Sequence, residues 1–217
     1  MTGSARYASV VLDVDSTVTQ IEGIEWLSQR CDATVRQRIQ ETTDAAMRGD
    51  VPLEAVYGER LQLVQPTRDA VDALSQAYID AITPGAADAV RALHAAHVRV
   101  VLVSGGLREA ILPLGAVLGV AAEDVQAVPI RFHADGTYDG YDTTSPLARR
   151  GGKPSVVASM NLPKPSFALG DGITDAELKP VVTTFAAFVG VVRHDPVVRV
   201  ADCVVTSFHE LPPLILS

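Results

Sequence analysis

Residues 10–18 of the chain read VVLDVDSTV, and this stretch decides the fold. The apolar run at its start is typical of a buried strand, and the polar residues after it are typical of a turn. Asp13 and Asp15 therefore lie just past the carboxyl end of a strand, where open α/β sheets bind their ligands. Two carboxylates at this spacing repel one another unless a cation or a proton intervenes. The segment predicts a chemical site at one edge of a parallel sheet.

The length and net charge of the chain limit the kinds of molecule that we expect it to bind. The chain has 217 residues, enough for one domain with a modest insertion, and it carries a formal net charge of −8. This charge argues against a general nucleic-acid or anionic-membrane surface. The first residues lack the segments of a signal peptide and no apolar run reaches membrane-spanning length, so we expect a soluble cytoplasmic protein. A homodimer is one assembly that the sequence leaves open.

Residues 34–82 contain no strand-like run and show apolar residues at helical spacing instead. Residues 50–52 and 65–67 interrupt this pattern. Thr67 is placed to cap the helix after it, and Pro52 suits the first turn of another helix. We therefore predict several amphipathic helices inserted after the first strand, in a helical cap domain that covers residues 19–82.

The rest of the chain alternates between strands and helices. Strands are expected at 8–13, 98–103, 166–169, 183–189 and 201–205. Helices are expected at 21–29, around 86–93, at 107–118 and at 153–160. Residues 125–143 are expected to form further strand structure with a hairpin turn at Asp135-Gly136. The alternation predicts an α/β fold with a doubly wound, mostly parallel, Rossmann-like sheet, whose core comprises residues 1–18 and 83–217.

Three of the predicted strands end in polar turns, and the carboxyl ends of parallel strands open on one edge of the sheet. The turns are DVD at 13–15, SGG at 104–106 and GDGITD at 170–175. Asp13, Asp15 and Asp171 offer the hard oxygen ligands that Mg²⁺ requires. The sequence therefore predicts a magnesium site where these turns meet.

The second turn offers hydrogen-bond donors for an anion. Ser104 and the amides of Gly105 and Gly106 are expected at a helix N-terminus, where backbone N–H groups point outward. Lys153 opens a predicted helix after two glycines and adds a mobile cation. Carboxylates, a metal, an anion cradle and a lysine together predict a phosphoryl-transfer site.

In their order along the chain, these motifs resemble those of the phosphoserine phosphatases of the haloacid dehalogenase superfamily. The motifs that carry the resemblance are DVDSTV at 13–18 with EGI at 22–24, SGG at 104–106, GGK at 151–153 and GDGITD at 170–175. The predicted cap is similar to that family's small helical cap in AM at 46–47, VP at 51–52 and ERL at 59–61. The likeness extends from about residue 10 to residue 210.

The resemblance implies a role for each motif residue. Asp13 would be the nucleophile that forms an aspartyl-phosphate, and Asp15 the general acid and base. Mg²⁺ would be held by Asp13, by Asp171 and by the backbone carbonyl of Asp15. Thr17 would orient Asp15 by hydrogen bonding, and Asp175 would steady the metal site or Lys153.

The resemblance also implies how a small phosphorylated amino acid would bind. Ser104, the Gly105 amide and Lys153 would hold the phosphoryl oxygens. Glu22 suits the substrate ammonium and Arg60 suits its carboxylate through a two-pronged contact, while Met47 would exclude water. The substrate-binding residues expected on this basis are Glu22, Met47, Arg60, Ser104, Gly105 and Thr174.

Residues 190–196, which read GVVRHDP, depart from the family, whose members often carry a glycine-rich turn with an asparagine here. Arg193 or His194 therefore either faces the site or lies on the loop surface.

Three functions remain open at this point. The expected function is Mg²⁺-dependent hydrolysis of O-phospho-L-serine, the last step of serine synthesis. A related phosphatase or phosphotransferase for another small phosphomonoester would keep the same chemistry. A signalling receiver also phosphorylates an aspartate at a strand end, but a general acid such as Asp15 and a helical cap argue for turnover.

Overall fold

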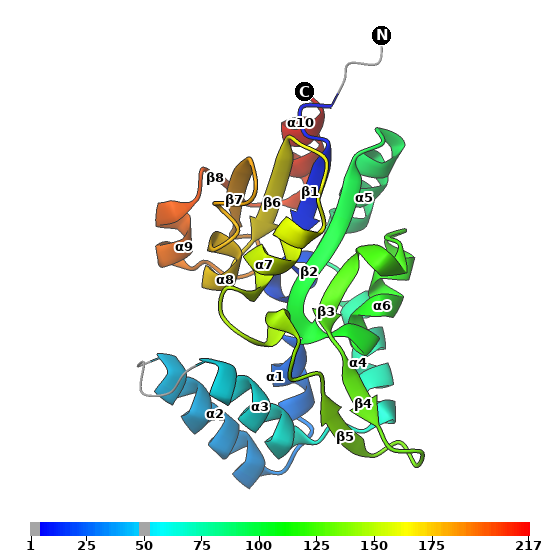
Figure 1. Cartoon of the computed structure of the whole chain (residues 1–217), viewed down its shortest axis with the longest axis vertical. Coiled ribbons are helices and arrows are strands. Elements are labelled where there is room, and N and C mark those ends of the chain that lie inside the picture. Colours follow the sequence, from blue (N-terminus) through cyan, green and yellow to red (C-terminus); the bar gives the residue numbers. More distant parts are fainter. Residues whose placement is uncertain (1–4, 48–52) are drawn as a thin grey trace.

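The computed structural model describes residues 5–47 and 53–217, and the side chains of all of these except 43–47 and 53–55. A six-stranded sheet crosses the molecule, and helices pack against both of its faces (Figure 1). This arrangement confirms the predicted doubly wound α/β fold.

The order of the strands places the site. The strands are β1 (Ser9–Leu12), β2 (Arg99–Leu107), β3 (Val125–Val128), β4 (Ile130–Phe132), β5 (Tyr138–Tyr141), β6 (Ser166–Gly170), β7 (Thr184–Phe188) and β8 (Cys203–Val205). The main sheet has the order β3-β2-β1-β6-β7-β8 with every neighbouring pair parallel, and β4 and β5 form a separate antiparallel hairpin. The chain moves outward from β1 to β3 and then returns to the other side of β1. The topological switch point therefore lies between β1 and β6, where a ligand crevice is expected.

Both faces of the sheet are apolar. Successive side chains of a strand point to opposite faces, and in the central strands the residues at successive positions are apolar. In β1, Val10 and Leu12 belong to one hydrophobic core and Val11 belongs to the other. The first core packs under α4, α5, α6 and α10, and the second packs under α7, α8 and α9. Two cores of this kind hold the central strands rigid, so the loops at their carboxyl ends start from fixed positions.

The helices largely follow the predicted pattern. They are α1 (Gly23–Ser28), α2 (Ala33–Met47), α3 (Leu53–Val64), α4 (Arg68–Asp80), α5 (Ala86–Ala95), α6 (Arg108–Val117), α7 (Gly152–Ser159), α8 (Ile173–Ala176), α9 (Asp195–Val200) and α10 (Leu211–Leu216). Shorter turns are η1 (Val14–Val18), η2 (Ala122–Asp124), η3 (Pro146–Ala148) and η4 (Phe208–Glu210). The Thr67 side chain accepts a hydrogen bond from the amide of Ala70 and caps α4, as predicted. Pro52 lies outside the described residues.

The inserted helices leave and re-enter the sheet region through one paired neck. Thr19 and Ile82 form an antiparallel bridge, and the amide of Thr83 donates to the carbonyl of Val18 over 2.9 Å. Within the insertion, α2 and α3 pack on each other away from the sheet, whereas α4 packs along α6 (Figure 1). The predicted helices are therefore present, and the last of them lies against the sheet side of the molecule.

Some element boundaries differ from the prediction. β2 continues through the SGG turn to Leu107, which pairs with Val128 after a shift in register, so α6 begins at Arg108. The hairpin turn at Asp135-Gly136 is confirmed, because the Gly136 amide donates to the carbonyl of His133 over 3.0 Å. None of the helices in the described ranges combines the length and apolarity that a bilayer crossing requires.

Candidate active site

Asp13 directly follows β1 and lies at the switch point of the sheet. Its amide donates to the carbonyl of Leu169 in β6 over 3.0 Å, which fixes the backbone there. The side chain is buried, and its Oδ1 lies 2.5 Å from Nζ of Lys153. Burial, and then the charge of Asp175, raise the pKa of Asp13 well above its ordinary value, while Lys153 opposes the increase. Ionised Asp13 therefore depends on the cation that contacts it.

Lys153 holds its ammonium group between two aspartates near the start of α7. Nζ donates to Oδ1 of Asp13 and, over 2.6 Å, to Oδ1 of Asp175. Burial lowers the pKa of this lysine, but the two carboxylates outweigh burial and raise the pKa above its ordinary value. Lys153 is therefore a charged group held between Asp13 and Asp175.

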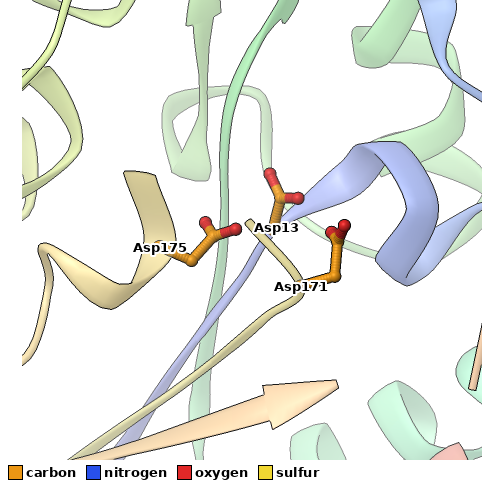
Figure 2. A group of neighbouring side chains, drawn as sticks. All are labelled: Asp13, Asp171 and Asp175. Carbon is orange, nitrogen blue, oxygen red and sulfur yellow. The ribbon is translucent and has the colours of Figure 1, made fainter. Parts of the chain in front are cut away.

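Asp13, Asp171 and Asp175 form a buried carboxylate cluster (Figure 2). One oxygen of each lies within 4.8 Å of the others, and they come from the ends of β1 and β6 and from α8. Asp175 is already engaged, because its Oδ1 accepts from Lys153 and its Oδ2 accepts from the amide of Gly172 over 2.9 Å. Burial and the charge of Asp175 raise the pKa of Asp171. Three buried carboxylates with one ammonium and oxygen-only donors fit a hard divalent cation, and the roles of Asp13 and Asp171 as its side-chain ligands stay a prediction.

Asp15 turns its carboxylate to a different set of partners. The Tyr78 hydroxyl and the Gly23 amide each donate to Oδ1 over 2.7 Å, and the Ser104 hydroxyl donates to Oδ2 over 3.2 Å. Burial, and then the charge of Asp15, raise the pKa of Tyr78 well above its ordinary value, so this hydroxyl remains a donor. The sequence grouped the Asp15 carboxylate with those of Asp13 and Asp171, whereas the structure directs it to these donors and leaves it out of the carboxylate cluster. The metal contact expected for its backbone carbonyl stays a prediction.

Tyr78 is a site residue that the sequence did not predict. Its position in the apolar stripe of α4 suggested ordinary core packing, although a buried tyrosine usually has a hydrogen-bond partner for its hydroxyl. Gly23 permits the contact, because a Cβ at Gly23 would lie 2.0 Å from the Tyr78 hydroxyl oxygen. The glycine of the EGI motif therefore leaves room for the group that binds Asp15.

The prediction that Thr17 orients Asp15 is wrong. The Thr17 hydroxyl donates to Oδ1 of Asp171 over 3.0 Å. Residues 14–18 form one wide turn, and Ser16 within it adopts the left-handed region with φ of 51°. This reversal brings Thr17 to the end of β6 instead of leaving it beside Asp15. Thr17 therefore positions a predicted metal ligand.

The SGG turn also differs from the expected anion cradle. Because β2 runs to Leu107, Gly105 and Gly106 lie in extended strand and not at a helix N-terminus. The Gly106 amide donates to the Ser104 hydroxyl oxygen over 2.8 Å, so the prediction that this amide faces an anion is wrong. Gly105 lines the cavity described below. Phosphate binding by Ser104 and Gly105 stays a prediction.

Glu22 lies at the entrance to α1 and faces the cavity. Its Oε1 accepts a hydrogen bond from the Ser16 hydroxyl over 2.6 Å. Burial, and then the charge of Asp15, raise the pKa of Glu22 from 4.5 to about 7. A carboxyl group in such surroundings gains from a cationic partner, which agrees with the ammonium contact expected for it.

Arg60 on α3 lines the same cavity. One terminal nitrogen donates to Oε2 of Glu25 over 2.8 Å, which ties α3 to α1. Its Nε is buried without a hydrogen-bond partner in the described part of the chain. Met47 is the last residue of α2, and its side chain lies outside the described part of the structure.

These groups enclose one cavity of about 250 Å³, room for a small molecule. The predicted residues that line it are Asp13, Asp15, Glu22, Arg60, Gly105, Lys153, Asp171, Thr174 and Asp175. Tyr57 and Arg149 line it as well, although no motif in the sequence marked them. The structure therefore brings together most of the predicted site.

The structure places Arg193 and His194, in the loop at residues 190–196, in different surroundings. Nε2 of His194 lies 3.5 Å from Oδ2 of Asp171. Arg193 pairs with Asp195 over 2.8 Å, and both of these side chains are exposed. His194 therefore faces the carboxylate cluster, and Arg193 lies on the surface.

Comparison with known proteins gives a consistent result. Residues 10–180 match the model of a family described as haloacid dehalogenase-like hydrolase. The chain is 37% identical to the phosphoserine phosphatase of Homo sapiens and 36% identical to that of Bos taurus, over 206 residues that cover 94% of this chain and 91% of each relative. It is also similar to the crystal structure of a phosphoserine phosphohydrolase-like protein from Francisella tularensis, with a TM-score of 0.83 and 25% identity over 95% of this chain and 99% of that one.

Proposed function

This chain belongs to the haloacid dehalogenase-like hydrolase family, and from this membership and its site we propose that it hydrolyses O-phospho-L-serine to L-serine and phosphate. The names of the curated relatives supply the substrate. One observation carries the chemistry: two acids on one cavity have separate partners, Asp13 with Lys153 and Asp15 with Tyr78. Different partners suit different roles in one reaction.

In the first step, an oxygen of Asp13 bonds to phosphorus while the bond from phosphorus to the serine oxygen breaks. Asp15, protonated at this stage, gives its proton to the leaving oxygen, so the serine hydroxyl departs neutral. The phosphoryl group is then an ester of Asp13. Lys153 remains beside Asp13 and offsets the negative charge that collects there.

In the second step, Asp15 is ionised and removes a proton from a water molecule. The water oxygen bonds to phosphorus as the bond from phosphorus to Asp13 breaks, which releases phosphate. Both aspartates return to their starting states. Tyr78 and the Gly23 amide hold the Asp15 carboxylate in one place through both proton transfers.

We assign the metal as Mg²⁺, which Asp13, Asp171 and the backbone carbonyl of Asp15 would hold. When bound, Mg²⁺ offsets the negative charge of the phosphoryl oxygens and of the attacking carboxylate. Thr17 positions Asp171, and Asp175 holds Lys153 in place. Ser104, the Gly105 amide and Lys153 would bind the remaining phosphoryl oxygens.

Recognition of the amino acid is assigned to the other side of the cavity. Glu22 receives the ammonium group and Arg60 the carboxylate, while Thr174 and Met47 complete the substrate contacts. Residues 19–82 would act as the helical cap that encloses the substrate. The proposed setting is the last step of serine biosynthesis in the cytoplasm, and a homodimer stays a prediction.

Phosphate release from a panel of substrates tests this proposal. The purified protein with Mg²⁺ is given O-phospho-L-serine, O-phospho-L-threonine, O-phosphoethanolamine or glucose 6-phosphate, with Asp13→Asn as the matched control. We expect the highest kcat/KM on O-phospho-L-serine and no turnover by the control.

The other outcomes distinguish the parts of the proposal. If the protein prefers a sugar phosphate to O-phospho-L-serine and Asp13→Asn abolishes that activity, the proposed substrate is wrong, whereas the proposed mechanism stands. Phosphate release that survives in Asp13→Asn would contradict the assigned nucleophile. Transfer to an added alcohol without free phosphate would indicate a phosphotransferase.

A further inference from the structure

Helix α3 presents two unpaired polar atoms beside the cavity. The Tyr57 hydroxyl and the Nε of Arg60 are buried and have no hydrogen-bond partner in the described part of the chain. Both residues line the cavity. Burying a donor without a partner costs free energy, so such atoms in a binding cavity indicate groups that a ligand satisfies.

The two donors lie together because of helix geometry. Tyr57 and Arg60 are three residues apart on α3, and residues at this spacing are neighbours on one helix face. A terminal nitrogen of Arg60 already donates to Glu25. The Tyr57 O–H and the Arg60 Nε–H are therefore the two donors on this helix face that no described group satisfies, and two donors match the two oxygens of a carboxylate.

The Tyr57 ring has a fixed orientation that does not depend on a ligand. It packs edge-on against the ring of Tyr141 in β5, with 5.3 Å between the ring centroids and an interplanar angle of 71°. A Cβ at Gly58 would lie 2.9 Å from the Tyr141 hydroxyl oxygen, so the Tyr141 side chain packs closely against α3. Burial, and then the charge of Asp15, raise the pKa of Tyr57, so its hydroxyl is a donor at all working pH values.

We propose that Tyr57 is a specificity-determining residue whose hydroxyl donates a hydrogen bond to the substrate carboxylate, beside the Nε–H of Arg60. This inference rests on the proposed function and adds to it a residue outside every motif. A substrate without the carboxylate would leave both buried donors unpaired, and polar sites discriminate strongly on this basis.

A comparison of two substrates tests the inference. O-phosphoethanolamine keeps the phosphate and ammonium of O-phospho-L-serine and lacks only the carboxylate. We expect Tyr57→Phe to lower kcat/KM on O-phospho-L-serine by about tenfold to a hundredfold, mainly through KM, as for the loss of a hydrogen bond to a charged group. The activity of this variant on O-phosphoethanolamine should stay within about twofold of the parent, because the lost bond is absent with that substrate.

Tyr138→Phe is the matched control. The Tyr138 hydroxyl is also buried and unpaired in the described part of the chain, but Tyr138 does not belong to the residues described as lining the cavity. Its removal should leave kcat/KM on both substrates unchanged. Thermal unfolding of both variants shows that each is folded.

Two results would overturn the inference while the proposed function stands: an unchanged kcat/KM of Tyr57→Phe on O-phospho-L-serine, or equal losses on both substrates. The substrate preference of the unsubstituted protein tests the proposed function separately. If it does not prefer O-phospho-L-serine to O-phosphoethanolamine, the carboxylate subsite and the proposed substrate both fall.

Discussion

The hydroxyl of Tyr78 and the carboxylate of Asp15 share a hydrogen bond of 2.7 Å, although 63 residues separate them in the sequence. Tyr78 is fully buried on α4, the inserted helix that packs along α6. The candidate general acid is therefore oriented by a residue from the inserted segment. Asp15 retains two further donors, the Gly23 amide and the Ser104 hydroxyl.

Replacing Tyr78 by Phe should lower kcat by about tenfold, equivalent to about 1.4 kcal/mol of activation free energy, because Asp15 loses one of its three donors. Stability should fall by about 1 kcal/mol through the loss of one hydrogen bond. Steady-state kinetics and thermal unfolding measure the two effects. Tyr7→Phe is the matched control, since the Tyr7 hydroxyl bonds to Thr184 away from the cavity and its loss should affect stability alone. An unchanged kcat in Tyr78→Phe would contradict the positioning role.

Gly23→Ala should reduce kcat at least as much as Tyr78→Phe, because the new Cβ would lie 2.0 Å from the Tyr78 hydroxyl oxygen and must displace that ring. The two substitutions should not be additive. With Phe at position 78 the nearest obstructing atom is gone, so Gly23→Ala should cost less in that background. A double-mutant cycle on kcat measures the difference, and strict additivity would show that the two sites act independently.

Lys153→Met should destabilise the protein by about 3–5 kcal/mol, because it leaves Asp13 and Asp175 buried without their cation. Urea unfolding of the metal-free protein measures the loss, and added Mg²⁺ should recover part of it. Lys179→Met is the matched control. Lys179 pairs with Asp202 at a partly exposed site, where an ion pair contributes no more than about 1 kcal/mol. Equal losses in the two variants would contradict the view that the buried cluster depends on Lys153.

The metal-free protein should become less stable as the pH rises from about 5 to about 8. Glu22 has a pKa raised from 4.5 to about 7 in the folded chain, so within that interval the folded state binds more protons than the unfolded state. Stability falls with rising pH wherever this holds. The raised pKa values of Asp13 and Asp171 act in the same direction.

Melting temperature against pH, with and without Mg²⁺, measures this linkage. Mg²⁺ should stabilise the protein more at pH 8 than at pH 5.5, because the cation offsets the charges that ionisation creates. Glu22→Gln removes one of the three groups and should flatten the metal-free profile. A metal-free melting temperature that rises over this range would contradict the assigned pKa directions.

The sequence predicted the architecture and the acidic centre well, for a physical reason. Apolar runs of strand length and the polar turns after them are local features, and the parallel sheet brings such turns to one edge. Asp13 and Asp171 could therefore be placed together from the sequence. Lys153 follows no strand, and its contacts with Asp13 and Asp175 depend on tertiary packing.

The partners within the site were less predictable, because they depend on side-chain directions. Thr17 lies two residues from Asp15, yet the reversal at Ser16 directs it to Asp171 instead. Tyr57 and Tyr78 look like core residues in a helical pattern, and only tertiary packing brings Tyr57 to the wall of the cavity and the Tyr78 hydroxyl to Asp15. The local periodicity of a sequence does not indicate hydrogen bonds between residues that lie far apart along the chain.

The neck formed by Thr19 and Ile82 bears on how the molecule could be divided and recombined. The two segments that form the neck run side by side. The residues between them could therefore be replaced by another segment without displacing the strands of the sheet. A graft made at the neck would, however, remove Tyr78 together with the helices that line the cavity. A transplant that keeps α1 and α4 with the recipient and exchanges only α2 and α3 would preserve that hydroxyl and the Gly23 amide, which both donate to Asp15. The functional boundaries of the exchangeable segment therefore lie within the insertion, after α1 and before α4, and not at the neck.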